Sequence, residues 1–98
     1  MADFRLSERA ERDLIEIYDH TEQTFGAYQA EAYHAGLAHS FALLADFPRI
    51  GTPIDEIAPG FRRFRFQAHA VFYTEEPDFI LIRAVLHQAR EVRPGVFE

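Results

Sequence analysis

The chain contains neither cysteine nor lysine among its 98 residues. Without cysteine it can form no disulfide framework and carry out no thiol chemistry. Without lysine it can use neither a lysine base nor a Schiff base, so all ten basic residues are arginine. The missing disulfides suit a reducing compartment, and we expect a cytoplasmic protein.

Long apolar segments are also missing. No run approaches the roughly 20 residues that a membrane-spanning helix needs, and residues 1–5 do not resemble a signal peptide. A chain of this length normally folds as one domain. We therefore expect a single soluble domain over residues 1–98, whose core is supplied by a hydrophobic content of 48% that includes ten phenylalanines.

The net charge of -6 is unevenly distributed. Residues 1–47 carry nine acidic side chains and three arginines, whereas residues 48–98 carry seven of each. An acidic half is unfavourable for a broad nucleic-acid surface, because phosphate contacts require positive charge. We expect no stable direct binding of nucleic acid, although the arginines of the second half could form a local site for an anion or a protein.

The most apolar run, residues 79–87, predicts a strand buried on both faces and therefore flanked by other strands. Because side chains alternate along a strand, one face should carry Phe79, Leu81, Arg83, Val85 and His87. The other face, which should contact the main core, would carry Ile80, Ile82, Ala84 and Leu86. Arg83 and His87 would then project together from the opposite surface.

Two amphipathic helices precede this strand. Ser7 is a suitable N-cap for a helix over residues 8–24, and a second helix is expected over residues 28–46. Gly26 is a typical helix stop, and the short link predicts an antiparallel helical hairpin. The acidic side chains of the first helix lie mostly off its apolar stripe. They are expected to be solvated, and their spacing does not suggest a metal site.

Short strands are expected over residues 4–6, 61–66 and 70–74, and the tail from residue 88 should be irregular. The predicted order is β-α-α-β-β-β, an α+β fold in which the helical hairpin packs on a small, mainly antiparallel sheet. The other sheet face should present Arg63 or Arg65 near Arg83 and His87. Such a face would form a cationic, partly apolar groove.

Arg83 and His87 allow two interpretations. Arg83 is either a structural cation paired with a carboxylate or a binding or catalytic cation at the floor of the groove. His87 is either an ordinary surface histidine or a group that titrates near neutral pH.

A series of short motifs covers nearly the whole chain in a characteristic order. The motifs are Phe4-Arg5-Leu6-Ser7, Leu14-Ile15-Glu16-Ile17-Tyr18, Phe47-Pro48-Arg49-Ile50-Gly51, Gly60-Phe61-Arg62-Arg63, Val71-Phe72-Tyr73 and Ile82-Arg83-Ala84-Val85-Leu86-His87-Gln88. In this order and spacing the sequence resembles the RelE/ParE toxin superfamily, and specifically its ParE branch.

The resemblance implies the toxin component of a type II toxin–antitoxin system. Such a toxin inhibits DNA gyrase and is neutralised in a hetero-oligomer with a ParD-like antitoxin encoded beside it. The antitoxin's C-terminal segment is expected to place a helix along the helical hairpin and an extended stretch near the sheet. The other branch of the superfamily comprises ribosome-dependent mRNA endonucleases, which is the alternative function.

The two branches differ in the residues that the chemistry needs. The RelE pattern uses lysines, arginines and a C-terminal tyrosine, but this chain has no lysine and no tyrosine beyond Tyr73. We therefore expect an inhibitor rather than an enzyme, with no cofactor and no metal. Under the alternative function, the candidate catalytic residues are Arg63, Arg65, Arg83 and His87.

Antitoxin contacts are expected from arginines of the sheet and from aromatic residues beyond those that the core requires. The candidates are Phe25, Tyr28, Arg63, Arg65, Arg83 and Phe97. The three aromatic residues could equally be ordinary surface side chains or core fillers.

Overall fold

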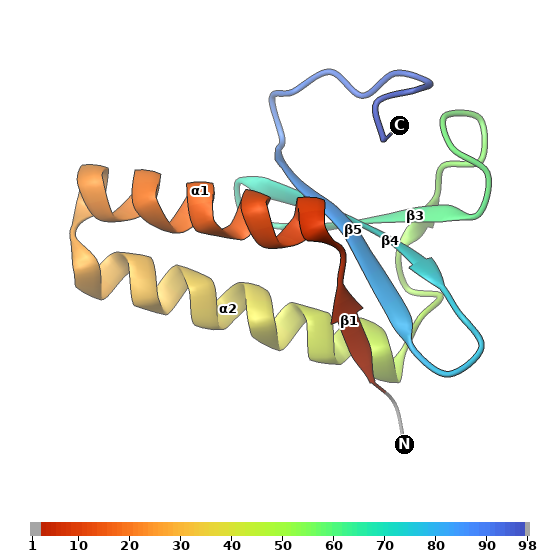
Figure 1. Cartoon of the computed structure of the whole chain (residues 1–98), viewed down its shortest axis with the longest axis horizontal. Helices are drawn as coiled ribbons and strands as arrows, with labels where there is room; N and C mark the ends of the chain where they lie inside the picture. The colour runs from red at the N-terminus through yellow and green to blue at the C-terminus, as the bar shows by residue number, and fades with distance from the viewer. Residues whose placement is uncertain (1–2, 98) are drawn as a thin grey trace.

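The computed structural model describes residues 3–97 and shows a helical hairpin against one face of a five-stranded sheet (Figure 1). The strands are ordered β1-β5-β4-β3-β2, and only the β1–β5 pair is parallel. The predicted α+β fold is therefore confirmed. The elements are β1 (Phe4–Leu6), α1 (Glu8–Phe25), α2 (Ala27–Asp46), β2 (Thr52–Pro53), β3 (Phe61–Phe66), β4 (His69–Glu75) and β5 (Ile80–His87).

The two helices begin and end close to where the sequence predicts. The Ser7 hydroxyl accepts the backbone N–H of Ala10 at 3.1 Å, which caps the first turn of α1. Gly26 has a φ of +94° and is the single residue between the helices, a conformation that favours glycine. Within the described residues, neither helix is long and apolar enough to cross a membrane.

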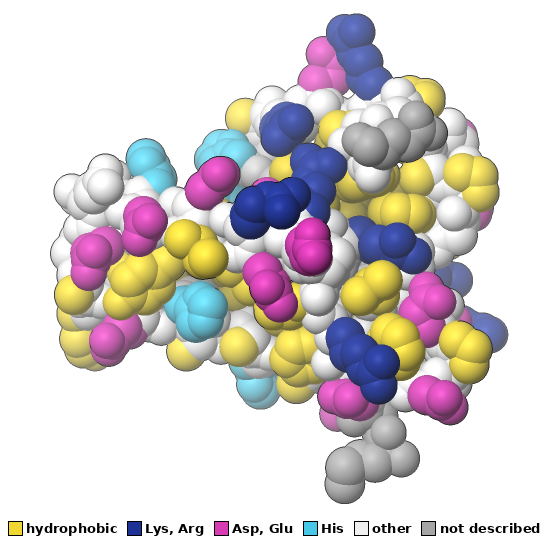
Figure 2. Space-filling view, in the orientation of Figure 1, with side chains coloured by type: hydrophobic (Ala, Val, Ile, Leu, Met, Phe, Trp, Pro, Cys, Tyr) yellow, Lys and Arg dark blue, Asp and Glu magenta, His cyan; other side chains and the backbone are white. Residues whose placement is uncertain are grey.

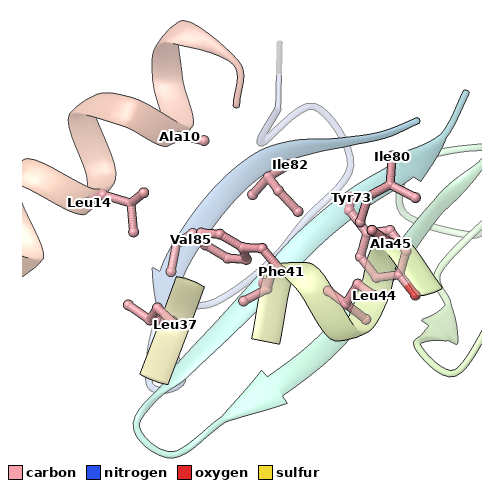
Figure 3. Close-up of a cluster of buried hydrophobic side chains, with 11 residues drawn as sticks. Ala10, Leu14, Leu37, Phe41, Leu44, Ala45, Tyr73, Ile80, Ile82 and Val85 are labelled. Carbon is pink, nitrogen blue, oxygen red and sulfur yellow. The ribbon is translucent and has the colours of Figure 1, made fainter. Parts of the chain in front are cut away.

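The main core lies between the helices and the sheet, as Figure 3 shows. Its helical side chains include Leu14, Leu37 and Phe41, which pack against strands β4 and β5. Val71 and Tyr73 of β4 belong to this core, while Ala70 and Phe72 lie on the opposite face. Side chains of β4 therefore alternate regularly between the two faces of the sheet.

Strand β5 departs from the predicted alternation because it contains a β-bulge. Its pairing with β4 steps from Phe72↔Ala84 to Tyr73↔Ile82, which leaves Arg83 as an extra residue. A bulge of this kind reverses which face the following side chains occupy. The sequence could not indicate it, because the residues on both sides of the bulge are apolar.

Several predicted orientations in β5 are consequently wrong. Val85 joins Ile80 and Ile82 in the main core, whereas Ala84 and Leu86 belong to the opposite face. His87 follows Val85 to the helical side, where it lines a hollow with residues of α1. Arg83 and His87 thus project from opposite faces rather than from one surface.

The second face of the sheet carries a smaller core that the C-terminal tail covers. Buried side chains of the sheet contact Val92, Val96 and Phe97 there. The ring of Phe97 stacks on Phe61 at 4.7 Å and contacts Phe72 at 5.0 Å between centroids. The tail is irregular, as predicted, but it is packed against the sheet.

Strand β2 was not predicted, and two of its features explain why. It has only two residues, too few to show a hydrophobic period, and one of them is Pro53. Proline is tolerated at a sheet edge, where β2 lies beside β3.

A buried tyrosine fastens the segment between α2 and β2 to the sheet. The Tyr73 hydroxyl donates to the carbonyl of Pro48 at 2.7 Å and accepts the N–H of Gly51 at 3.0 Å. A Cβ at position 51 would collide with this hydroxyl, which explains the glycine. Tyr73 is fully buried, and burial raises the pKa of its phenol.

We predict that Tyr73→Phe destabilises the fold by about 2 kcal/mol, because one buried and one partly buried backbone group lose their partner. Urea unfolding followed by circular dichroism measures this difference. Tyr28→Phe is the matched control, since the Tyr28 side chain is 87% exposed. Equal stability of the two variants would contradict the assigned role of the Tyr73 hydroxyl.

Candidate functional site

Arg83 is held by neighbours on the second face of the sheet. Its Nε donates to the hydroxyl of Thr74 at 3.1 Å, and its Nη2 lies 3.7 Å from a carboxylate oxygen of Glu76. The guanidinium also lies over the ring of Phe61, 5.5 Å from its centroid. The geometry therefore matches the interpretation of Arg83 as a paired, structural cation.

His87 belongs to a cluster of histidines on the helical side. Its ring contacts that of His69 edge-on at 5.5 Å, and its Nδ1 accepts the N–H of Ala89 at 3.1 Å. The Tyr33 hydroxyl of α2 lies 2.6 Å from Nδ1 of His69. His20 of α1 completes the cluster, and two adjoining hollows of about 350 and 460 Å³ share these three histidines.

Burial decides the protonation of His69. It lowers the pKa of the imidazole, and the neighbouring His87 and His20 lower it further. Burial also raises the pKa of Tyr33, so both partners of the short hydrogen bond are neutral near pH 7. Asp13, Glu16 and Arg90 line the adjoining hollow and are the other charged groups that face this cluster.

Arg63 and Arg65 line a separate hollow of about 410 Å³ with Thr52, Ala70 and Gln88. Arg65 donates to the carbonyl of Gln67 at 3.1 Å and to the side chain of Gln88. Both arginines are exposed and lie on the second face, as predicted.

The predicted groove that joins these arginines to Arg83 and His87 does not form. His87 is on the other face, and Arg83 is engaged by Glu76. The register places Phe72 between Arg63 and Ala84, and Phe97 covers the Phe72 ring. The structure therefore separates these groups instead of assembling one acid–base site.

The three aromatic candidates occupy different environments. Phe25 and Tyr28 flank the hairpin turn and are 68% and 87% exposed. Phe97, in contrast, packs within the chain against Phe61 and Phe72. Of these three candidates, therefore, Phe25 and Tyr28 offer aromatic surface that the described residues leave uncovered.

The sequence analysis did not predict a groove that lies along the helical hairpin. This hairpin groove holds about 550 Å³ and is lined by Leu6, Glu11, Leu14, Ile15, Tyr18, Asp19 and His34. Figure 2 shows apolar and histidine surface over the hairpin, with acidic side chains on either side. The one sequence feature that could have indicated this groove is Ile15, an apolar residue on the acidic side of α1. Its side chain is 62% exposed in the structure.

The exposed apolar, aromatic and charged features of the surface are suited to binding another protein. Among the described residues no group of three or more potential ligands is placed to hold a metal ion. The exposed features are an apolar groove with acidic edges, two aromatic rings at the hairpin turn and an arginine-lined hollow. These are the elements of a protein-binding surface.

We predict that His69 makes stability depend on pH. The unfolded chain gains a proton near pH 6.5, whereas folded His69 gains one only at lower pH, so stability falls as the pH drops below about 6.5. His69→Asn, which keeps a neutral hydrogen-bonding group, should lose less stability between pH 7 and pH 5. Urea unfolding at both pH values measures this.

His39→Asn is the control for His69, because His39 is an exposed residue of α2 outside the cluster. It should retain the pH dependence of the unmodified chain. A His69→Asn variant with that same dependence would show that the group responsible lies elsewhere.

Comparison with known proteins identifies the relatives of this chain. The family model for the ParE toxin of the type II toxin–antitoxin system, parDE, matches residues 4–92. Toxin ParE1 of Caulobacter vibrioides is 37% identical over 93 residues, which are 95% of this chain and 96% of that protein. Toxin ParE1 of Mycobacterium tuberculosis is 41% identical over 91 residues, covering 91% and 92%.

Solved structures show the same fold. A chain from the chromosomal ParDE system of P. aeruginosa aligns with a TM-score of 0.77 at 19% identity, covering 89% of this chain and 96% of that one. A chain of the toxin–antitoxin complex RelBE2 from Mycobacterium tuberculosis aligns with a TM-score of 0.60, also at 19% identity, covering 89% and 98%.

Proposed function

We propose that this chain, which belongs to the ParE toxin family of type II toxin–antitoxin systems, inhibits DNA gyrase. We further propose that a ParD-like antitoxin neutralises it. Inhibition would occur by binding the target and not by cleaving RNA. Full-length similarity to two proteins named Toxin ParE1 is the observation that carries the proposal.

The positions of Arg83 and His87 support a binding mechanism. A nuclease needs an acid, a base and cations gathered around one phosphate. Here the bulge sends these two side chains to opposite faces, and Glu76 pairs with Arg83. The paired arginine is therefore less able to hold a substrate phosphate.

The antitoxin is proposed to cover two surfaces of unlike chemistry. The hairpin groove would receive its helix, and the hollow beside Arg63 and Arg65 would receive its extended stretch. Phe25 and Tyr28 are further candidate contacts because of their exposure. Such a large, divided interface is typical of a segment that folds as it binds.

The first prediction of this proposal concerns the target. The purified chain should inhibit supercoiling by gyrase or trap cleaved DNA, and addition of the ParD-like antitoxin should restore supercoiling. Agarose gel assays of plasmid topology measure both effects. In parallel, mRNA in a translating extract should stay intact; cleaved transcripts with unaffected gyrase would instead favour the endonuclease function.

The second prediction concerns the arginine hollow. Arg65→Glu should weaken the antitoxin complex about tenfold, because it reverses a charge that would face the extended stretch. Arg93→Glu is the matched control, since Arg93 lies in the tail and pairs only with the nearby Glu91 among the described residues. Isothermal titration calorimetry measures both affinities, and an unchanged value for Arg65→Glu would remove this hollow from the interface.

A further inference from the structure

The hairpin groove has acidic residues along the wall formed by α1. On a helix, residues three and four apart share one face, so Glu11, Ile15, Tyr18 and Glu22 form a single row. The apolar pair in the middle of this row is thus bracketed by two carboxylates. Asp19 adds a third beside them and also lines the groove. Partial desolvation raises the pKa of Tyr18, and the carboxylates of Glu31 on α2 and of Glu22 and Asp19 on α1 raise it further.

Helix α2 contributes His34 to the groove, and its sequence beyond Glu31 differs in character from α1. Between Glu31 and Asp46 this helix contains no acidic residue and no arginine. Its buried stripe packs on the sheet, yet Ala35, Ala38 and Ala42 form an exposed row on another side. A helix with apolar residues on more than one side normally has a second element against it. Alanines also allow a partner to approach closely.

We propose that the antitoxin segment in this groove is an amphipathic helix with a row of basic residues along the edge that faces α1. This inference rests on the proposed function and specifies the chemistry of the partner. The part of the edge that faces α2 beyond Glu31 would carry small, uncharged residues, and branched apolar side chains between the two edges would contact Ile15 and Tyr18.

The spacing of the carboxylates sets the spacing of the basic residues. Glu11 and Glu22 are eleven residues apart, which is about 16 Å along a helix. A partner helix that runs along α1 would therefore place two arginines or lysines about three turns apart. Charge pairs at the edge of an interface select partners, because a wrong pairing brings like charges together.

The same charges argue against a second copy of this chain as the occupant. Two copies that met through their grooves would bring the acidic rows of their α1 helices together, and the groove walls supply no lysine and no arginine to offset them. A basic partner helix removes the repulsion that such a dimer would create.

The test uses the full chain and a full-length ParD-like antitoxin. Calorimetry at low and high salt should show that the double variant Glu11→Gln/Glu22→Gln binds about tenfold more weakly and depends less on salt. Glu16→Gln is the matched control, because Glu16 is on α1 but outside the row. Ile15→Ala should weaken binding by a similar factor at both salt concentrations, since its contribution is apolar.

A charge exchange makes the result specific. Glu11→Arg/Glu22→Arg should abolish tight binding, and replacement of the two facing basic residues of the antitoxin by glutamate should restore it. Circular dichroism of each variant establishes that it is folded, and both Glu11 and Glu22 are exposed, so their replacement leaves the core unchanged.

The outcomes separate this inference from the proposed function. If the unmodified chain neither inhibits gyrase nor binds the antitoxin, the proposed function fails. If it does both, but the double Gln variant binds as tightly as the unmodified chain, the inference is overturned. Sedimentation of the chain alone provides a further check: a dimer that Ala38→Glu converts to a monomer would identify a second copy as the occupant and also overturn it.

Discussion

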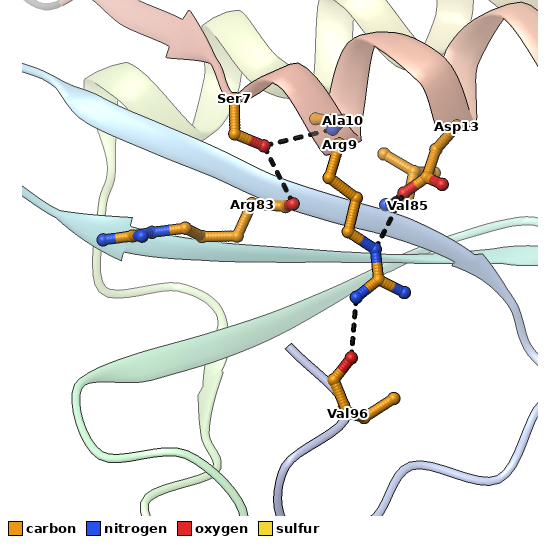
Figure 4. Close-up of polar contacts among 7 residues, drawn as sticks. All are labelled: Ser7, Arg9, Ala10, Asp13, Arg83, Val85 and Val96. Carbon is orange, nitrogen blue, oxygen red and sulfur yellow. Dashed lines mark hydrogen bonds and ion pairs between the residues drawn. The ribbon is translucent and has the colours of Figure 1, made fainter. Parts of the chain in front are cut away.

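The junction between the start of α1 and the middle of β5 is the constraint on which the rest of the structure depends (Figure 4). Strand β1 ends at Leu6, and the next residue, Ser7, donates its N–H to the carbonyl of Ile82 at 3.0 Å and its hydroxyl to that of Arg83 at 2.9 Å. Asp13, nearly two turns into the helix, accepts the N–H of Val85 at 3.0 Å. Ser7 and Asp13 thus satisfy the edge of β5 where β1 no longer pairs with it. The helix direction, the bulge and the faces of the sheet are linked through these few bonds.

The same junction anchors the C-terminal tail. Arg9 of α1 donates to the carbonyl of Val96 at 2.6 Å and lies 3.9 Å from the Asp13 carboxylate. Its exposed fraction of 28% limits the strength of this ion pair, but the hydrogen bond to the carbonyl positions the tail over the second face. One helix therefore organises both cores: its apolar stripe contacts the first, and Arg9 fixes the segment that covers the second.

The sequence predicted the elements more accurately than their faces, and the reason is physical. Helix boundaries depend on local signals such as the Ser7 cap and the Gly26 turn, and both were readable. At the bulge, the carbonyl of Arg83 accepts a hydrogen bond from the Ser7 hydroxyl, which is distant in the sequence, and no local period reveals such a contact. Predictions of functional sites were affected in the same way. The exposure of Phe25 and Tyr28 agrees with the prediction of surplus aromatic surface, whereas the joint groove of Arg83 and His87 failed with the alternation that implied it.

The distribution of charge bears on how a single partner could cover this molecule. The hairpin groove has acidic edges, while the hollow on the second face carries Arg63 and Arg65. A partner that covers both must itself change sign along its chain, from basic where it lies on α1 to neutral or acidic where it reaches the arginines. A compact globular partner would have to match two differently oriented surfaces at once, but a flexible segment can match them in turn. The first half of the sequence is acidic and the second half carries most of the arginines. In the folded chain this asymmetry requires a partner whose basic segment and whose neutral or acidic segment follow one another in a matching order.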